Sequence, residues 1–294
     1  MNIFITGGTG FIGTPLVERL AKDRTNKLLV LSRRSQPRQP RVTYLRGDLD
    51  DIGRWKGQLM RFKPTVAVHL AWEGIPDYSA PTSIKNLTAS LRLLDVLAGA
   101  GCKKVICAGS SWEKGFQAPR AEQRPPERTL AFVAAKQALH ELGLAMARER
   151  NVSFSWARLM FVYGPGQKTS SLIPYLIACA QKNQRPELKN PGAKNDFIYV
   201  ADVAEALAAI IKKGQPDTTY EIGSGALTTV RDVVRLVFKT YGVPLPAAAL
   251  KRQPPSASFS GVRADPAVIR GLGWRPKTSL QAGIKKMVDS YASN

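Results

Sequence analysis

The sequence is poor in acidic residues and in the residues that most often build metal or disulfide sites. It has 22 Asp and Glu against 43 Lys and Arg, with three cysteines and two histidines. Cys102, Cys107 and Cys179 form no CxxC pair and have no metal-ligand spacing with the histidines. We therefore predict no disulfide framework and no metal site, and expect reduced, buried thiols in a cytoplasmic protein.

Long hydrophobic runs are also absent. No apolar stretch reaches the roughly 20 residues of a membrane-spanning helix, and residues 1–6 predict a strand rather than a signal peptide. We expect no membrane partner. The 294 residues, 44% apolar and 22% charged, are those of an ordinary globular protein with a substantial core.

The scarcity of acidic residues leaves a net charge of +21. Such a charge predicts affinity for anions, namely nucleotides, phosphorylated substrates or nucleic acid. The basic residues are scattered along the chain and form no basic tail. We favour a generally cationic surface over dedicated RNA binding, which stays open as the less favoured interpretation.

The first half of the chain alternates short apolar runs with amphipathic stretches, which predicts βαβ units. The expected strands are Asn2–Thr6, Lys27–Ser32, Val42–Arg46, Thr65–Leu70, Lys103–Ala108 and Ser153–Arg158. The expected helices are Phe11–Lys22, Asp51–Phe62, Ile84–Ala100 and Ala131–Glu149. The predicted fold class is α/β, a doubly wound parallel sheet of the Rossmann type with helices on both faces.

The sequence pattern changes near residue 164, and this change predicts a domain boundary. Beyond it prolines separate shorter elements. We predict a dinucleotide-binding Rossmann domain over residues 1–164 and a smaller, mixed substrate-binding domain over residues 165–294. The segment 195–213, with an expected strand Phe197–Val200 and helix Ala201–Lys212, is predicted to return to the first domain.

A glycine array follows the first strand directly. Its sequence is Gly7-Gly8-Thr9-Gly10-Phe11-Ile12-Gly13, and the helix expected after it opens within the array. Glycines let backbone N–H groups approach phosphate oxygens, and the helix dipole favours their negative charge. Because the array has a strand before it and a helix after it, the pattern predicts a bound dinucleotide.

The end of the second strand bears on which dinucleotide binds. A carboxylate at this point selects NAD through the ribose 2′-hydroxyl, whereas arginine pairs with a 2′-phosphate. The chain has Arg33 and Arg34 there and no carboxylate. The pattern favours NADPH/NADP, with NAD as the alternative, unless both arginines are merely solvated surface residues.

Several further motifs resemble those of the extended short-chain dehydrogenase/reductases, the nucleotide-sugar epimerase, dehydratase and ketoreductase group. The similarity extends from Met1 to about Tyr291. Besides the glycine array, the motifs are Gly47-Asp48-Leu49, His69-Leu70-Ala71-Trp72, Ala108-Gly109-Ser110-Ser111-Trp112-Glu113, Lys136, Arg158 to Gly166, Asp196 to Asp202, Ile222 to Gly225 and Gly273 to Pro276. The chain looks most like reductases of nucleotide-linked 4-keto-6-deoxysugars, such as CDP-abequose synthase.

This resemblance implies roles for individual residues. The cofactor-binding positions, apart from the two arginines, are Gly7, Thr9, Gly10, Phe11, Ile12, Gly13, Asp48, Leu49, Leu70, Ala71 and Lys136. The substrate-binding positions are Trp72, Ser111, Trp112, Glu113, Arg158 and Tyr163. Ser110 matches the hydroxyl that bonds the reacting sugar oxygen, and Lys136 matches the lysine that holds the cofactor ribose.

One catalytic position departs from the family pattern. The family's proton donor is a tyrosine four residues before the lysine, and this chain has Phe132 there. A positioned acid is typically worth about 10²–10⁴ in rate. Three explanations stay open: an engineered Tyr→Phe change, a rewired site in which Tyr78, Tyr163, Glu113 or water gives the proton, or a non-catalytic relative.

The sequence thus predicts an NADPH-dependent reductase of a nucleotide-diphosphate deoxysugar, with Ser110, Phe132 and Lys136 at the catalytic positions. One alternative is an NAD-type nucleotide-sugar 4-epimerase. The other is a non-catalytic nucleotide-sensing or RNA-binding relative. A homodimer is compatible with the sequence. The missing Asp-Glu pair after Ser110 disfavours a dehydratase.

Overall fold

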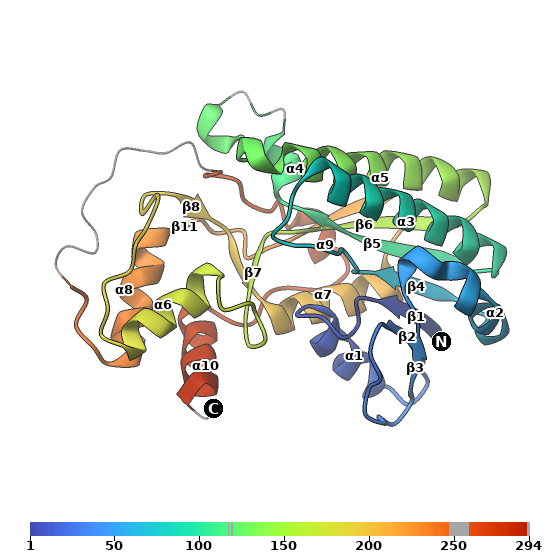
Figure 1. The fold of residues 1–294 in the computed structure, drawn as a ribbon, viewed down its shortest axis with the longest axis horizontal. Helices are drawn as coiled ribbons and strands as arrows, with labels where there is room; N and C mark the ends of the chain where they lie inside the picture. The colour runs from blue at the N-terminus through green and yellow to red at the C-terminus, as the bar shows by residue number, and fades with distance from the viewer. Residues whose placement is uncertain (117, 119, 247–258, 293–294) are drawn as a thin grey trace.

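The structure is a computed structural model that describes residues 1–116, 118, 120–246 and 259–292 (Figure 1). Its centre is a seven-stranded sheet in which every pair of neighbouring strands is parallel. From one edge to the other the strands are β10 (Thr218–Ile222), β6 (Ser153–Leu159), β5 (Lys104–Ser110), β4 (Val66–His69), β1 (Asn2–Thr6), β2 (Lys27–Ser32) and β3 (Val42–Arg46). The predicted parallel sheet is confirmed.

Helices cover both faces of this sheet. On one face α1 (Gly13–Ala21) and α7 (Val200–Lys213) pack through apolar residues such as Leu16 and Val203 (Figure 1). On the other lie α2 (Ile52–Phe62), α3 (Ala80–Gly99) and α5 (Leu130–Glu149), which bury residues such as Leu93 and Leu139. The doubly wound α/β fold class is therefore confirmed.

Within the main sheet and the helices that cover it, α3 and β10 depart most from the sequence prediction. Helix α3 begins at Ala80, earlier than the expected Ile84, with a proline in its first turn, where the missing N–H has no partner to lose. Strand β10 was not predicted. It pairs with β6 alone at the sheet edge, and its short sequence Thr-Thr-Tyr-Glu-Ile lacks the continuous apolar run of a central strand.

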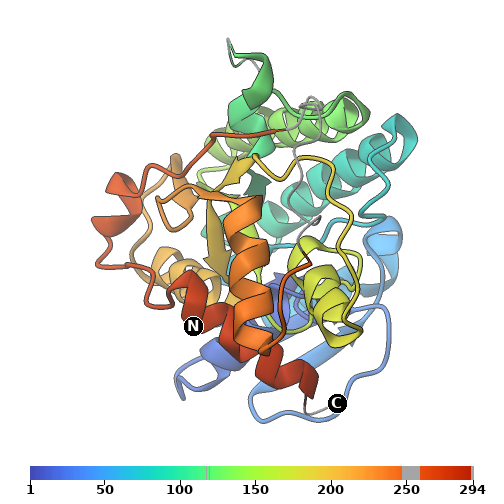
Figure 2. The same ribbon diagram turned by 90° about the vertical axis from the view of Figure 1, so that its left-hand side faces the viewer.

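The second half of the chain adds a smaller lobe beside the sheet. Helices α6 (Leu172–Gln181), α8 (Val230–Tyr241) and α10 (Leu280–Ala292) pack together around a separate apolar cluster (Figure 2). Two short sheets join it, β11 (Thr228–Thr229) with β8 (Lys194–Asn195), and β7 (Phe161–Tyr163) with β9 (Phe197–Tyr199). The domain boundaries given above stay a prediction.

The remaining elements are short. They are the helices α4 (Trp112–Gly115) and α9 (Ala267–Arg270) and the 3-10 turns η1 (Leu49–Asp51), η2 (Ala121–Gln123) and η3 (Glu127–Thr129). The three cysteines are buried and free. Over the described residues, none of the helices combines the length and apolar character that crossing a membrane requires.

Candidate active site

The site forms where the direction of chain crossover reverses. Strand β1 lies between β2 and β4, so the chain leaves β1 toward one side of the sheet and later continues on the other. In open parallel sheets, ligands bind at the carboxyl ends of the strands at such a point. Here the glycine array follows β1, and Leu70, Ala71 and Trp72 follow β4.

The glycine turn is shaped for a close approach of backbone to ligand. Gly7 has φ +70°, and a Cβ there would lie 2.7 Å from the Ala71 nitrogen. At Gly13 a Cβ would lie 2.0 Å from the Gly7 oxygen, so only glycine lets α1 begin so near the turn. Gly10 is exposed, and a Cβ there would meet only the Gly7 oxygen, at 3.2 Å. The space over Gly10 is therefore left for a ligand.

The first turn of α1 is equally suited to an anion. Ile12 at the N-cap offers no side-chain hydrogen bond, and the first turn has no acidic residue. The Thr14 N–H donates to the Gly10 carbonyl at 2.9 Å and Pro15 has no N–H, so the helix dipole is the main attraction that the first turn offers to an anion. A pyrophosphate therefore fits this turn. Thr9 beside it is exposed, while Phe11 and Ile12 are half-buried.

The adenosine end of the predicted cofactor site contains ion pairs. Asp48 caps the η1 turn by accepting a hydrogen bond from the Asp50 N–H at 3.1 Å, and Leu49 packs against the core. The exposed Arg33 pairs with Glu73, which lies in the segment after β4, with 2.8 Å between Nη1 and Oε1. Arg34 is exposed and makes no ion pair within the described part of the chain.

A buried polar chain fixes the segment after β4. The Ser90 hydroxyl donates to the Asn86 carbonyl at 2.6 Å, so it accepts from His69 Nε2 at 2.8 Å. His69 Nδ1 then accepts from the Thr6 hydroxyl at 2.6 Å. This tautomer is neutral, because burial and the nearby charge of Lys136 lower the pKa of His69 to about 3.

Lys136 and Phe132 occupy the same face of α5, one turn apart. The buried Lys136 ammonium donates to the Ala108 carbonyl at 2.8 Å and lies 3.9 Å from the centre of the Trp72 ring. Burial lowers the pKa of Lys136 to about 8, although Glu113 acts in the opposite direction. The lysine is thus held beside β5, two residues before Ser110.

Phe132 lies in an aromatic cluster formed with Trp72, Tyr78 and Trp112. Its ring centre is 5.4 Å from Trp72, 5.3 Å from Tyr78 and 5.8 Å from Trp112, with interplanar angles of 67–87°. These are the edge-to-face contacts that aromatic rings favour. Phe132 is only 5% exposed. The position of the missing tyrosine is therefore filled and enclosed by rings.

Ser110 ends β5, and its hydroxyl accepts from the Trp112 N–H at 3.3 Å, which leaves its own proton free to donate. The neighbouring Ser111 is buried, and its N–H donates to the Leu159 carbonyl. The Ser110 N–H donates to the carboxylate of Glu113.

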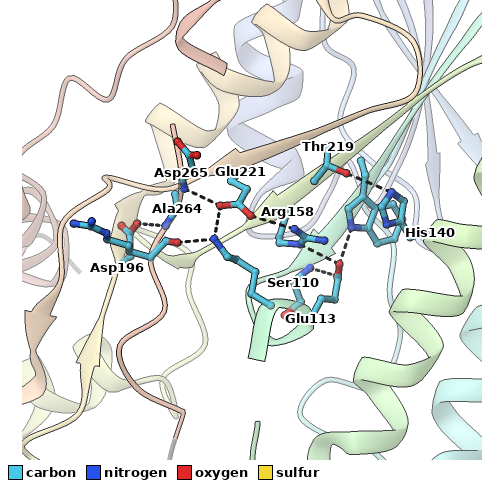
Figure 3. A network of polar contacts seen from close by, with 12 residues as sticks. Ser110, Glu113, His140, Arg158, Asp196, Thr219, Glu221, Ala264 and Asp265 are labelled. Atoms are coloured by element: carbon cyan, nitrogen blue, oxygen red, sulfur yellow. Dashed lines mark hydrogen bonds and ion pairs between the residues drawn. The ribbon is translucent and has the colours of Figure 1, made fainter. Parts of the chain in front are cut away.

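Glu113 is buried and bonded to three protein donors, the first of which is the Ser110 N–H. Its buried carboxylate also accepts from Trp156 Nε1 at 2.8 Å and from Arg158 Nε at 3.3 Å (Figure 3). Trp156 in turn stacks on His140 with 4.7 Å between ring centres.

The network continues from Arg158 toward the C-terminal segment. The Arg158 guanidinium also pairs with Glu221 at 3.1 Å, and Glu221 accepts from Lys114 and from the Asp265 N–H (Figure 3). The predicted substrate residues Arg158 and Glu113 are therefore engaged with each other and with neighbouring protein groups.

The structure separates the side chains named as substitute proton donors. The Tyr163 hydroxyl donates to the Leu280 carbonyl at 3.5 Å, and its ring is buried against α10 in the smaller lobe. Glu113 accepts three hydrogen bonds. Tyr78 alone among the three contacts Phe132, and its hydroxyl makes no hydrogen bond within the described residues.

Residues 3–223 match the NAD dependent epimerase/dehydratase family. The chain belongs to this family. Curated relatives include dTDP-L-rhamnose 4-epimerase of Burkholderia thailandensis, 24% identical over 97% of this chain and 93% of that protein. CDP-abequose synthase of Salmonella muenchen is 26% identical over 98% of this chain and 97% of its own length.

Solved structures agree with this assignment. UDP-glucose 4-epimerase of Thermus thermophilus in complex with NAD has a TM-score of 0.82 and 25% identity, over 99% of both chains. Membership of the epimerase/dehydratase family confirms the resemblance found in the motifs. Because the family is described as NAD dependent, membership also supports a nicotinamide cofactor. It does not decide between NAD and NADPH.

The sequence did not single out Glu73 and Glu221, and it named Asp196 only as the start of a motif, without a role. The buried Asp196 accepts from the N–H and hydroxyl of Ser224 and from the N–H groups of Gly225 and Ala264. It belongs to a quoted family motif, which was the available signal. Among the described residues, no cluster of His, Cys, Asp and Glu could hold a metal ion.

Proposed function

We propose that this protein reduces a keto group on a nucleotide-activated deoxysugar with NADPH. The observation that carries the proposal is the pairing of a dinucleotide cradle with arginines, and no carboxylate, at the end of β2. Guanidinium groups suit a 2′-phosphate because they make charge-assisted bidentate hydrogen bonds. A cofactor that carries this phosphate favours net reduction over the internal redox cycle of an epimerase.

Each part of the site has a task in this proposal. Gly7, Gly10, Gly13 and the N-terminus of α1 hold the pyrophosphate, and Asp48 and Leu49 contact the adenosine end. When bound, the cofactor supplies a hydride to the carbonyl carbon. Lys136 holds the nicotinamide ribose, with its charge kept next to β5 by the Ala108 carbonyl.

The substrate side uses the free proton of Ser110. Its hydroxyl donates to the sugar carbonyl and stabilises the oxyanion that develops there. Trp72 and Trp112 provide apolar walls. Glu113 and Arg158, which are occupied by each other and by Glu221, act by holding the Ser110 backbone.

We assign the proton transfer to Tyr78. Its ring contacts Phe132 with 5.3 Å between centres, which brings the phenol next to the place of the family tyrosine. Burial raises the pKa of Tyr78, although Arg128 acts in the opposite direction, so the phenol is protonated at neutral pH. A protonated phenol is the form from which an alkoxide can take a proton.

The test is an exchange of the two hydroxyl positions. Parent, Tyr78→Phe, Phe132→Tyr and the double variant are assayed with NADPH and a CDP- or dTDP-linked 4-keto-6-deoxyglucose. We expect an active parent, a fall in kcat of about 10²–10⁴ in Tyr78→Phe, and partial rescue in the double variant. Tyr44→Phe is the control. Tyr44 lies on the edge strand β3, which β4, β1 and β2 separate from β5, and its hydroxyl donates a hydrogen bond to Gln39.

Other outcomes point elsewhere. An inactive parent that Phe132→Tyr activates would indicate a site disabled by that one missing hydroxyl. An active parent that tolerates Tyr78→Phe would contradict the assignment to Tyr78. Loss of all turnover in every variant, with cofactor binding intact, would favour the non-catalytic alternative.

An NAD-dependent nucleotide-sugar 4-epimerase is the second candidate. It is favoured by the similarity to dTDP-L-rhamnose 4-epimerase and to a UDP-glucose 4-epimerase solved with NAD. An epimerase regenerates its cofactor in each cycle, whereas a reductase consumes it stoichiometrically. Product analysis by NMR beside NADPH absorbance therefore separates the two functions in one reaction mixture.

A further inference from the structure

The ion pair between Arg33 and Glu73 joins two segments on either side of the predicted cofactor site. Arg33 follows β2 and Glu73 lies after β4, and these strands flank β1 on its two sides. A bond between the two segments therefore crosses the carboxyl end of β1, where the glycine turn begins. Arg33 Nη1 and Glu73 Oε1 are 2.8 Å apart.

Glu73 is anchored there by more than this pair. Its N–H donates to Asn86 Oδ1 at 2.7 Å, and its carbonyl accepts from Asn86 Nδ2 at 3.1 Å. Asn86 is buried, and its carbonyl accepts from Ser90 at the end of the Thr6–His69–Ser90 chain. The main chain of Glu73 is thus fixed, and its carboxylate reaches Arg33 from a rigid base.

The second carboxylate oxygen of Glu73 is also occupied. Lys85 on α3 lies 2.8 Å from it and 2.7 Å from Asp50, and these two partners raise the pKa of Lys85. The four side chains Arg33, Glu73, Lys85 and Asp50 form a chain of alternating charge that sums to zero. Within this chain, the negative group that contacts Arg33 is the Glu73 carboxylate, and Arg33 is the side chain that we propose to meet the cofactor ribose.

We propose that Glu73 is a specificity-determining residue that competes with the 2′-phosphate for Arg33. The inference rests on the proposed use of NADPH. A phosphate that pairs with Arg33 must displace the Glu73 carboxylate from Nη1 or bind beside it, and the two like charges repel while both are present. The 2′-hydroxyl of NADH carries no such charge. Glu73 thus weakens the binding of NADPH selectively and keeps the two cofactors closer in affinity than the arginines alone would.

The test measures dissociation constants of NADPH and NADH by fluorescence titration at low ionic strength, where surface charges are least screened. In Glu73→Gln we expect NADPH to bind about threefold to fivefold more tightly, the size typical of an exposed ion pair, and NADH to change by less than about twofold. Because the gain acts through Arg33, the double variant Arg33→Ala/Glu73→Gln should bind NADPH no more tightly than Arg33→Ala alone.

Glu205→Gln is the matched control. Glu205 pairs with Arg19 at 2.5 Å, and its side chain is 43% exposed against 42% for Glu73. The substitution removes one negative charge from an ion pair between α1 and α7. It therefore measures how far a more cationic protein, in general, binds NADPH more tightly. An equal gain in this control, an equal gain for NADH, no gain, or weaker NADPH binding in Glu73→Gln would each overturn the proposal. A parent that prefers NADH would instead count against the proposed NADPH use, and the Glu73 comparison could still be read.

Discussion

Lys136, which we propose to hold the cofactor ribose, carries a buried charge that affects stability. Burial lowers its pKa to about 8, from 10.5 for a free lysine. Between these two values the unfolded chain binds more protons than the folded one, so the free energy of unfolding rises with pH through this window. Below it the lysine is charged in both states, and the folded state bears the cost of burying the charge.

We therefore expect Lys136→Met to be more stable than the parent near about pH 7, by up to about 3 kcal/mol. The difference should shrink as the pH rises from about 8 to 10.5. Urea unfolding at several pH values measures it, with Lys56→Met on the exposed face of α2 as the control. A difference that does not change with pH would mean that the pKa of Lys136 is the same in the folded and unfolded states, so that other interactions fully compensate the burial of its charge.

At the scale of elements, glycine has two different functions in the turn from β1 into α1: Gly13 allows close packing, and Gly10 leaves space for the proposed ligand. In Gly13→Ala the new Cβ would lie 2.0 Å from the Gly7 oxygen, so the helix must move. We expect a loss of about 1–3 kcal/mol or more in the free energy of unfolding. Gly10→Ala meets nothing nearer than 3.2 Å and should fold normally.

The same Gly10→Ala methyl fills the space that the ligand needs, so we expect dinucleotide binding about tenfold weaker, or more, than in the parent. Thermal unfolding without ligand and titration with NADPH measure the two effects separately. If Gly10→Ala binds NADPH as the parent does, the pyrophosphate does not lie over Gly10.

The elements also show how far the sequence could predict this molecule. Central strands such as β4 were predicted because a parallel strand buried on both faces is a continuous apolar run. Strand β10 was not, because its sequence Thr-Thr-Tyr-Glu-Ile lacks that apolar run and lies in the second half of the chain, where prolines interrupt the βαβ alternation. The glycine cradle was predictable because turn and helix are adjacent in sequence. The ion pairs of Arg33 and Arg158 were not, because their partners Glu73 and Glu221 come from distant segments.

For the whole molecule, the question is what the net charge of +21 recognises. Several basic residues of the site region are already paired, among them Arg33, Lys85, Lys114 and Arg158. The excess of positive charge belongs to residues scattered over the chain, and a scattered positive surface attracts polyanions without reading their sequence.

We therefore expect short RNAs of unrelated sequence to bind equally, and to lose about tenfold or more of their affinity between about 50 mM and about 200 mM salt. NADPH should displace them little, because its cradle is a built site and the RNA contacts are diffuse. Fluorescence anisotropy with two labelled RNAs, with and without NADPH, measures both effects. Tight binding at the higher salt with a preference for one sequence would instead support the RNA-binding alternative, and competition by NADPH would place the RNA in the cofactor site itself.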